Sequence, residues 1–157
     1  MDVLAELDRE DFLILDADGR IHAAYPFSAV PTPHRLRLAS RVEAWAICAI
    51  DARGAAAMLG QDVAITPCDP VDGRPITVTF TDGTVRWEPA EAVVFVGQRD
   101  QVGPAATVCC GALNFFAAPS TAGTWVRQHP EVHGRITSQA EALRIAEQPF
   151  DPLLARD

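Results

Sequence analysis

The chain has 157 residues, of which 48% are hydrophobic and 22% charged, so it can form one folded domain with a buried core. The formal net charge is −8 and the 13 Lys and Arg residues form no basic run, which argues against nucleic acid as a partner. No apolar stretch reaches the roughly 20 residues that span a bilayer, and the acidic start does not resemble a signal peptide. These features predict a cytoplasmic globular protein without a membrane partner.

The N-terminal third begins with an acidic segment and leads into a predicted helix. Residues 1–11 are predicted to form an acidic arm, and residues 12–157 to form the folded domain. Two extended runs follow the arm and are joined by a turn at residues 16–19. From about Ala39 to Leu59 the alanine-rich pattern predicts one long helix, with Gly60 as its C-cap.

The rest of the chain is predicted to contain strands followed by short helices. Its middle is rich in alternating apolar and β-branched residues, separated by Asp-Gly turns. Residues 106–119 are interpreted as a buried strand that carries two adjacent cysteines. Ser120 can cap one short helix, and Ser138 with Glu141 forms a capping box for another. The predicted class is α+β, with a mixed, mostly antiparallel sheet packed against one long and two short helices.

The four cysteines stand at positions 48, 68, 109 and 110 and lack the paired CxxC spacing of a zinc finger. Without a secretion signal, such cysteines are more often thiols, metal ligands or catalysts than disulfide partners. Successive side chains of a strand point to opposite sides. We therefore expect at most one of Cys109 and Cys110 to face a given pocket.

One group of residues carries possible chemistry. In the predicted helix, Cys48 and Asp51 are three positions apart, which puts the sulfur and the carboxylate on one face. Trp45, one turn earlier, would shield that face from water, and Cys109 would supply a second sulfur from the strand. Two thiolates hold a soft ion such as Hg(II), and a carboxylate can relay a proton. An ordinary packing role remains an alternative, because a cysteine on an apolar helix is usually a small buried hydrophobe.

The order of several segments resembles the catalytic domain of the organomercurial (alkylmercury) lyases. The resemblance covers about residues 12–154. Its most specific part pairs WAICAID at 45–51 with VCCGALNFFAAPSTAGTW at 108–125. The resemblance implies an organomercurial lyase-like fold and cleavage of a carbon–mercury bond.

The resemblance also implies a role for each matching residue. Cys48 and Cys109 correspond to the two essential cysteines of the family, and Asp51 to its catalytic aspartate. Cys110 corresponds to a neighbour that cleavage does not need, and Cys68 to a cysteine usually regarded as structural. In the implied reaction two thiolates bind the mercury of R–Hg⁺ and a proton passes through Asp51 to the carbon. A hydrocarbon leaves, and Hg(II) stays on the sulfurs as bound product.

The implied partners are an organomercurial or soft metal ion as substrate and external cellular thiols or a mercuric reductase as acceptor of Hg(II). No resident cofactor is implied. Trp45, Cys110 and Phe115 are further candidates to line the pocket.

The chain departs from the family pattern at two points. Only about eleven residues precede the first hairpin, where the family usually carries an N-terminal helical domain. Gly111 and Asn114 stand at positions where the family has histidine or a histidine-like residue. Three alternatives therefore remain: a soft-metal (Cu or Hg) binding protein, a shortened homologue acting on an organic substrate in a biosynthetic pathway, and a remnant whose cysteines only pack.

Overall fold

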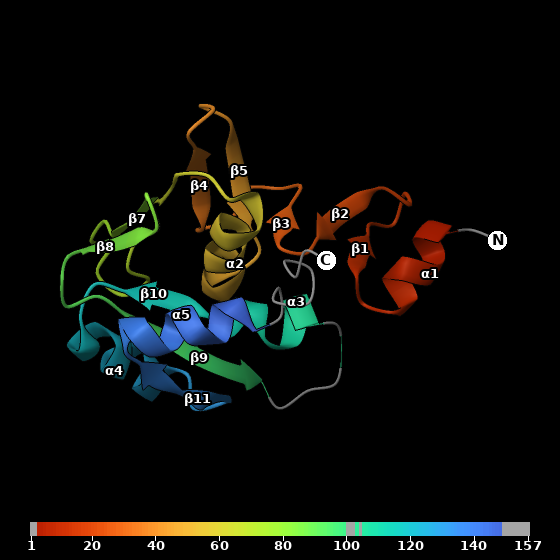
Figure 1. The fold of residues 1–157 in the computed structure, drawn as a ribbon. Helices are drawn as coiled ribbons and strands as arrows, with labels where there is room; N and C mark the ends of the chain where they lie inside the picture. Colours follow the sequence, from red (N-terminus) through yellow and green to blue (C-terminus); the bar gives the residue numbers. More distant parts are fainter. Residues whose placement is uncertain (1–2, 100–102, 104, 149–157) are drawn as a thin grey trace.

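The computed structural model describes residues 3–99, 103 and 105–148 of the protein. The end of the predicted domain, residues 149–157, lies outside this part. Runs of consecutive strands are separated by helices along the described chain (Figure 1), and the predicted α+β class is confirmed. Its α-helices are α1 (Val3–Arg9), α2 (Ala49–Leu59), α3 (Ala105–Val108), α4 (Pro119–Gln128) and α5 (Gln139–Glu147).

Two sheets hold the strands of the described residues, and all their strand pairs are antiparallel. The larger sheet has the order β1-β2-β3-β5-β4-β6-β7-β8, and the smaller has the order β10-β9-β11. The strands are β1 (Leu13–Leu15), β2 (Ile21–Ala24), β3 (Phe27–Ser28), β4 (Arg35–Leu38), β5 (Glu43–Ala46), β6 (Val63–Ile65), β7 (Thr77–Thr81), β8 (Thr84–Glu88), β9 (Val93–Arg99), β10 (Asn114–Phe116) and β11 (Val132–Thr137).

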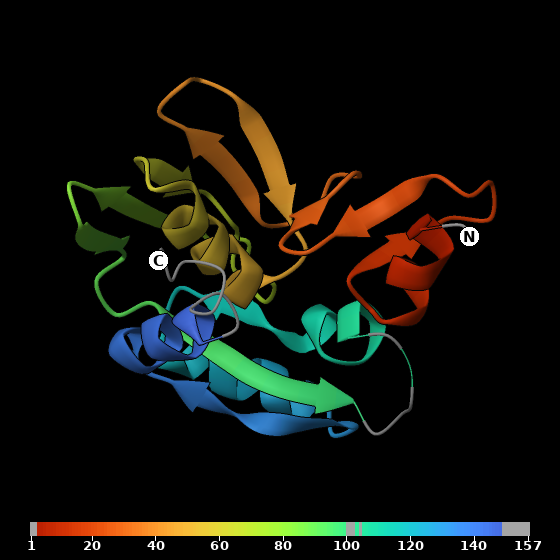
Figure 2. The ribbon, with the colours of Figure 1, turned by 45° about the vertical axis from the view of Figure 1, so that its right-hand side comes forward.

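Helix α2 packs against α5, and both take part in the main core, which also includes residues of β4, β6, β7 and β9. A smaller core lies between α4 and the three-stranded sheet, around the rings of Phe95, Phe116 and Trp125. The N-terminal segment, α1 with β1 and β2, extends to one side of the molecule, close to α3 (Figure 2). No helix in the described part is long and apolar enough to cross a membrane.

The long helix predicted over Ala39–Leu59 is wrong in its first half. Residues 43–46 form strand β5, and helix α2 begins only at Ala49. Strand β5 forms a hairpin with β4 on one side and pairs with β3 on the other, so its backbone groups are satisfied by two strands. Those pairings outweigh the helical preference of the alanines. The predicted end of the helix is confirmed, because Gly60 adopts φ 57° as its left-handed C-cap.

The strand predicted at residues 106–119 is also wrong in its first half. Helix α3 ends at Val108, Cys110–Ala112 form a short 3₁₀ turn, and only Asn114–Phe116 belong to strand β10. The Asp11 carboxylate accepts the backbone N–H of Ala105 at 3.0 Å, so the first turn of α3 is stabilised by a residue far away in the sequence. Local periodicity does not reveal such a partner.

The two short predicted helices are present as α4 and α5. Ser138 caps α5 by accepting the N–H of Glu141, as predicted. Helix α4 begins one residue before Ser120, with Ala118 as N-cap and Pro119 in the first turn, so the predicted cap is wrong.

Candidate active site

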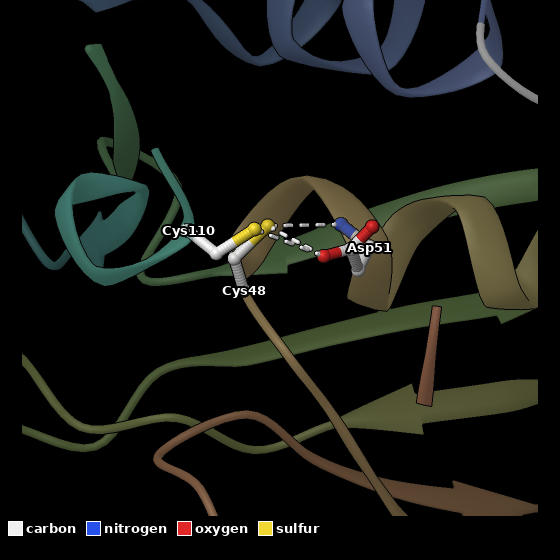
Figure 3. A group of neighbouring side chains, drawn as sticks. All are labelled: Cys48, Asp51 and Cys110. Carbon is white, nitrogen blue, oxygen red and sulfur yellow. Dashed lines mark hydrogen bonds between the residues drawn. The ribbon is translucent and has the colours of Figure 1, made fainter. Parts of the chain in front are cut away.

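Three buried side chains, those of Cys48, Asp51 and Cys110, meet at the start of α2 (Figure 3). Their possible ligand atoms all lie within 4.8 Å of one another. The Cys48 thiol donates to Asp51 Oδ2 over 3.0 Å, and the Cys110 thiol approaches the same oxygen at 3.7 Å. Two sulfurs and one carboxylate are thus gathered within the reach of a single metal ion.

The N-cap of α2 explains why Cys48 and Asp51 face each other. Cys48 has extended backbone, with φ −147°, and its sulfur accepts the N–H of Asp51 at 3.4 Å. The Asp51 carboxylate in turn accepts from the Cys48 thiol, so two contacts hold the side chains of these residues together at the start of α2. The sequence analysis expected the two side chains on one helix face. They do meet, but across a cap and not along a helix.

The second sulfur of the group belongs to Cys110, whereas the sequence analysis assigned it to Cys109. The two cysteines lie in a helical turn, where successive side chains diverge by about 100°. Cys109 is half-buried and borders a separate hollow of about 490 Å³, which His133 also lines. The expected meeting of Cys48, Asp51 and Cys109 is therefore absent from the structure, because the segment that carries the pair is not a strand.

The other candidates lie around or away from this group. Trp45 is half-buried on strand β5, so its expected place one helical turn before Cys48 is wrong. Phe115 is buried in the core that contains Cys48 and Cys110, and its ring lies 5.8 Å from those of Trp87 and His34. Cys68 is exposed, and its segment is held by a backbone bridge to Pro75 rather than by the sulfur.

Burial sets the protonation of the group. It raises the pKa of the Cys48 thiol well above its ordinary value, and the neighbouring Cys110 and Asp51 act in the same direction. Burial also raises the pKa of the Asp51 carboxyl, although the thiols of Cys48 and Cys110 oppose this. The Cys48 thiol therefore remains protonated until a metal displaces its proton. Asp51 is an unusually basic carboxylate, placed to receive that proton.

Two further residues, which the sequence alone did not reveal, shape this region. Asp11 holds the helix that leads to Cys109 and Cys110, and Asp69 accepts the N–H of Ala117 at the end of β10. Both contacts join segments far apart in the chain, so neither has a local sequence signal.

Comparisons with known proteins agree on one family. The family model "MerB: Alkylmercury lyase" matches residues 27–151. An alkylmercury lyase of Staphylococcus epidermidis is 35% identical over 119 residues, which cover 74% of this chain and 54% of that protein. An alkylmercury lyase of Bacillus cereus is 31% identical over 133 residues, which cover 83% of this chain and 59% of that protein. The chain thus spans little more than half the length of these relatives.

A solved structure supports the same relationship at the level of the fold. The crystal structure of the mercury-bound form of MerB2 aligns with a TM-score of 0.81 at 27% identity, over 95% of this chain and 72% of that one.

Proposed function

Because the chain belongs to the alkylmercury lyase family, we propose that it cleaves the carbon–mercury bond of an organomercurial by protonolysis. The observation that carries the proposal is the buried group in which Cys48 and Cys110 both face Asp51 Oδ2. The structural similarity to a mercury-bound MerB2 adds support. The products would be a hydrocarbon and Hg(II) held by two sulfurs.

The first step is capture of the mercury by one sulfur. Hg(II) is a soft ion and prefers thiolates to oxygen and nitrogen ligands. As the Cys48 sulfur bonds to the mercury of R–Hg⁺, its proton moves to Asp51 Oδ2, 3.0 Å away. The raised pKa of Asp51 favours this transfer, because the buried carboxylate is more stable when protonated.

The second step is closure by the other sulfur and transfer of the proton to carbon. Cys110, whose sulfur lies 3.7 Å from the same oxygen, bonds to the mercury and releases its own proton. Two thiolate ligands make the bound carbon more electron-rich, so it accepts the proton held by Asp51 as the carbon–mercury bond breaks. In balance, R–Hg⁺ and two thiols give the hydrocarbon, one mercury dithiolate and one proton.

The mechanism needs no resident cofactor. It does need an acceptor for Hg(II), and we propose that a cellular thiol or a mercuric reductase removes the ion from the two sulfurs. The four cysteines are free in the structure, and the mechanism requires them reduced. A cytoplasmic setting, where thiols are kept reduced, is therefore part of the proposal.

The second sulfur can be identified by experiment. Reduced protein would be mixed with a phenylmercury salt and excess small dithiol, and released benzene measured by gas chromatography. We expect Cys48→Ser and Cys110→Ser to lose at least about 100-fold in rate, a typical loss when a group that handles the proton is removed. Cys109→Ser should keep most of the activity. If Cys109→Ser lost activity and Cys110→Ser kept it, the second sulfur would be that of Cys109, as the resemblance to the lyases implies.

Soft-metal binding without cleavage is the second candidate function. A preformed pair of thiols, such as that of Cys48 and Cys110, is sufficient to hold Hg(II) or Cu(I). Tight binding of one ion per chain with no benzene release from the phenylmercury salt would select this function. Turnover of an organic substrate in metal-free buffer would instead indicate a biosynthetic role.

A further inference from the structure

Asp11 connects the two parts of the chain that deliver the sulfurs of the proposed site. It lies in the connection between α1 and β1, ahead of the segment that the alkylmercury lyase family model matches. Its Oδ2 accepts the backbone N–H of Ala105 at 3.0 Å. Its Oδ1 accepts the hydroxyl of Tyr25 at 3.4 Å. The Asp11 carboxylate thus joins the start of α3 to the segment that carries Tyr25.

The first of these contacts fixes the turn that carries Cys110. Ala105 begins helix α3, and its carbonyl accepts the N–H of Cys109 at 2.8 Å. Ala105 is therefore held through its N–H by Asp11 and through its carbonyl by Cys109. The 3₁₀ turn with Cys110 follows directly. A shift of Ala105 would be transmitted to the sulfur through a single helical turn.

The second contact fixes the approach to Cys48. Tyr25 packs against the main core, and the carbonyl of the next residue, Pro26, accepts the N–H of Ile47 at 3.1 Å. Ile47 directly precedes Cys48, the N-cap of α2. The Asp11 carboxylate is consequently connected to the residue before Cys48 through two hydrogen bonds, its own with Tyr25 and that between Pro26 and Ile47. Figure 2 shows the N-terminal segment close to α3 on the same side of the molecule.

We propose that Asp11 is a positioning residue, which clamps the turn carrying Cys110 to the loop beside Cys48 so that both sulfurs can bind one mercury atom. The inference rests on the proposed function, since it concerns the same two sulfurs. Two ligands held in advance bind a metal more tightly than two that must first be ordered. Loss of the clamp should therefore weaken chelation while both thiols remain present.

The test compares Asp11→Gly with Asp11→Asn. Asp11 has φ 59°, a conformation that glycine and asparagine tolerate, so neither replacement adds backbone strain. The oxygen of asparagine can still accept from Ala105 and its NH₂ group can donate to the Tyr25 hydroxyl oxygen, whereas glycine can make neither contact. Asp8→Ala is the matched control, because it removes a carboxylate of the same segment that bonds to Leu15 and not to α3.

The primary readout is Hg(II) binding, measured with HgCl₂ in competition with dithiothreitol. We expect Asp11→Gly to bind about 10- to 100-fold more weakly, as when a residue that orients a metal ligand is removed. Asp11→Asn should restore affinity to within about 3-fold, and Asp8→Ala should match the unaltered protein. Tyr25→Phe should show a smaller loss in the same direction. Unchanged affinity in Asp11→Gly, or failure of asparagine to restore it in a folded protein, would overturn the proposal.

Alkylation of the one-to-one mercury complex gives a second readout. In the unaltered protein Cys48 and Cys110 should both resist iodoacetamide, with exposed Cys68 as the internal control. In Asp11→Gly, Cys110 should become reactive while Cys48 remains protected. Neither readout involves a carbon–mercury bond. If the unaltered protein binds Hg(II) but releases no hydrocarbon, the proposed function fails while the role of Asp11 stands.

Discussion

Among the residues that the structure describes, two carboxylates are buried, those of Asp51 and Asp69, and their surroundings differ in kind. Asp69 is 2% exposed and accepts three conventional hydrogen bonds, from the N–H groups of Val71 and Ala117, each at 2.8 Å, and from the Thr121 hydroxyl at 2.5 Å. Asp51 is 8% exposed, and its side chain accepts only from the two thiols in the described structure. One carboxylate joins a loop to the start of α4, and the other lies between two sulfurs.

The difference lies in the strength of the donors. Backbone N–H and hydroxyl groups stabilise a buried anion well, whereas a thiol is a weak donor. The charged form of Asp51 is therefore poorly compensated, and burial raises its pKa. A carboxylate with strong donors holds segments together, and one with weak donors is available to exchange a proton. Both side chains are buried, but the strong donors give Asp69 a structural role, whereas the weak donors suit Asp51 to proton transfer.

The largest expected effect is on catalysis in Asp51→Asn. The amide has nearly the same shape as the carboxylate and can still accept from Cys48, but it cannot hold the proton that the carbon must receive. Release of benzene from phenylmercury should fall by at least about 100-fold. Thermal unfolding should occur at the same or a higher temperature, because a poorly compensated buried charge is removed. An active Asp51→Asn enzyme would mean that the proton reaches the carbon by another route.

The same replacement at Asp69 should have the opposite outcome. An amide offers one acceptor oxygen, and its NH₂ group would face a donor that the carboxylate now satisfies. The free energy of unfolding, measured with urea, should fall by about 2–4 kcal/mol. Activity per folded molecule should be retained. A loss of stability in Asp51→Asn equal to that in Asp69→Asn would remove the contrast between the two carboxylates.

His34 extends the comparison to a buried base. Its Nδ1 has no hydrogen-bond partner within the described part of the chain, and burial lowers the pKa of the imidazole to about 4. In the unfolded chain the pKa is 6.5, so the unfolded state binds more protons between these values and stability falls as the pH decreases from 6.5 to 4. Below pH 4 the loss should reach roughly 3 kcal/mol.

Urea unfolding at several pH values measures this effect. In His34→Leu the fall in stability over this pH window should be largely absent, whereas exposed His22→Gln should retain it. Asp51 acts in the opposite sense, because its raised pKa makes the folded state bind more protons and lowers stability as the pH rises. Measurement in the Asp51→Asn background separates the two. An unchanged pH dependence in His34→Leu would show that the imidazole can be charged in the folded protein.

The contrast between the two carboxylates also shows what sequence reasoning reaches. The α+β class, the end of α2 at Gly60 and the cap at Ser138 follow from local patterns and are confirmed. The proximity of Cys48 and Asp51 was expected because they are three positions apart. The pairing of β5 with β3, the turn at Cys110 and two of the partners of Asp69 depend on segments distant in sequence, which no local pattern records. The role of Cys109 rests on the resemblance to the lyases and stays a prediction.

The smallest expected effect concerns Cys68, the residue next to Asp69. The resemblance to the lyases implies a structural cysteine at this position, yet the side chain is exposed while that of Asp69 is buried. Neighbouring side chains of an extended segment point to opposite sides, so anchoring by Asp69 leaves Cys68 facing solvent. Cys68→Ser should change the free energy of unfolding by less than about 0.5 kcal/mol and leave benzene release unchanged. A loss as large as that of Asp69→Asn would show that the sulfur shares in holding this loop, and that the strong donors around Asp69 do not hold it alone.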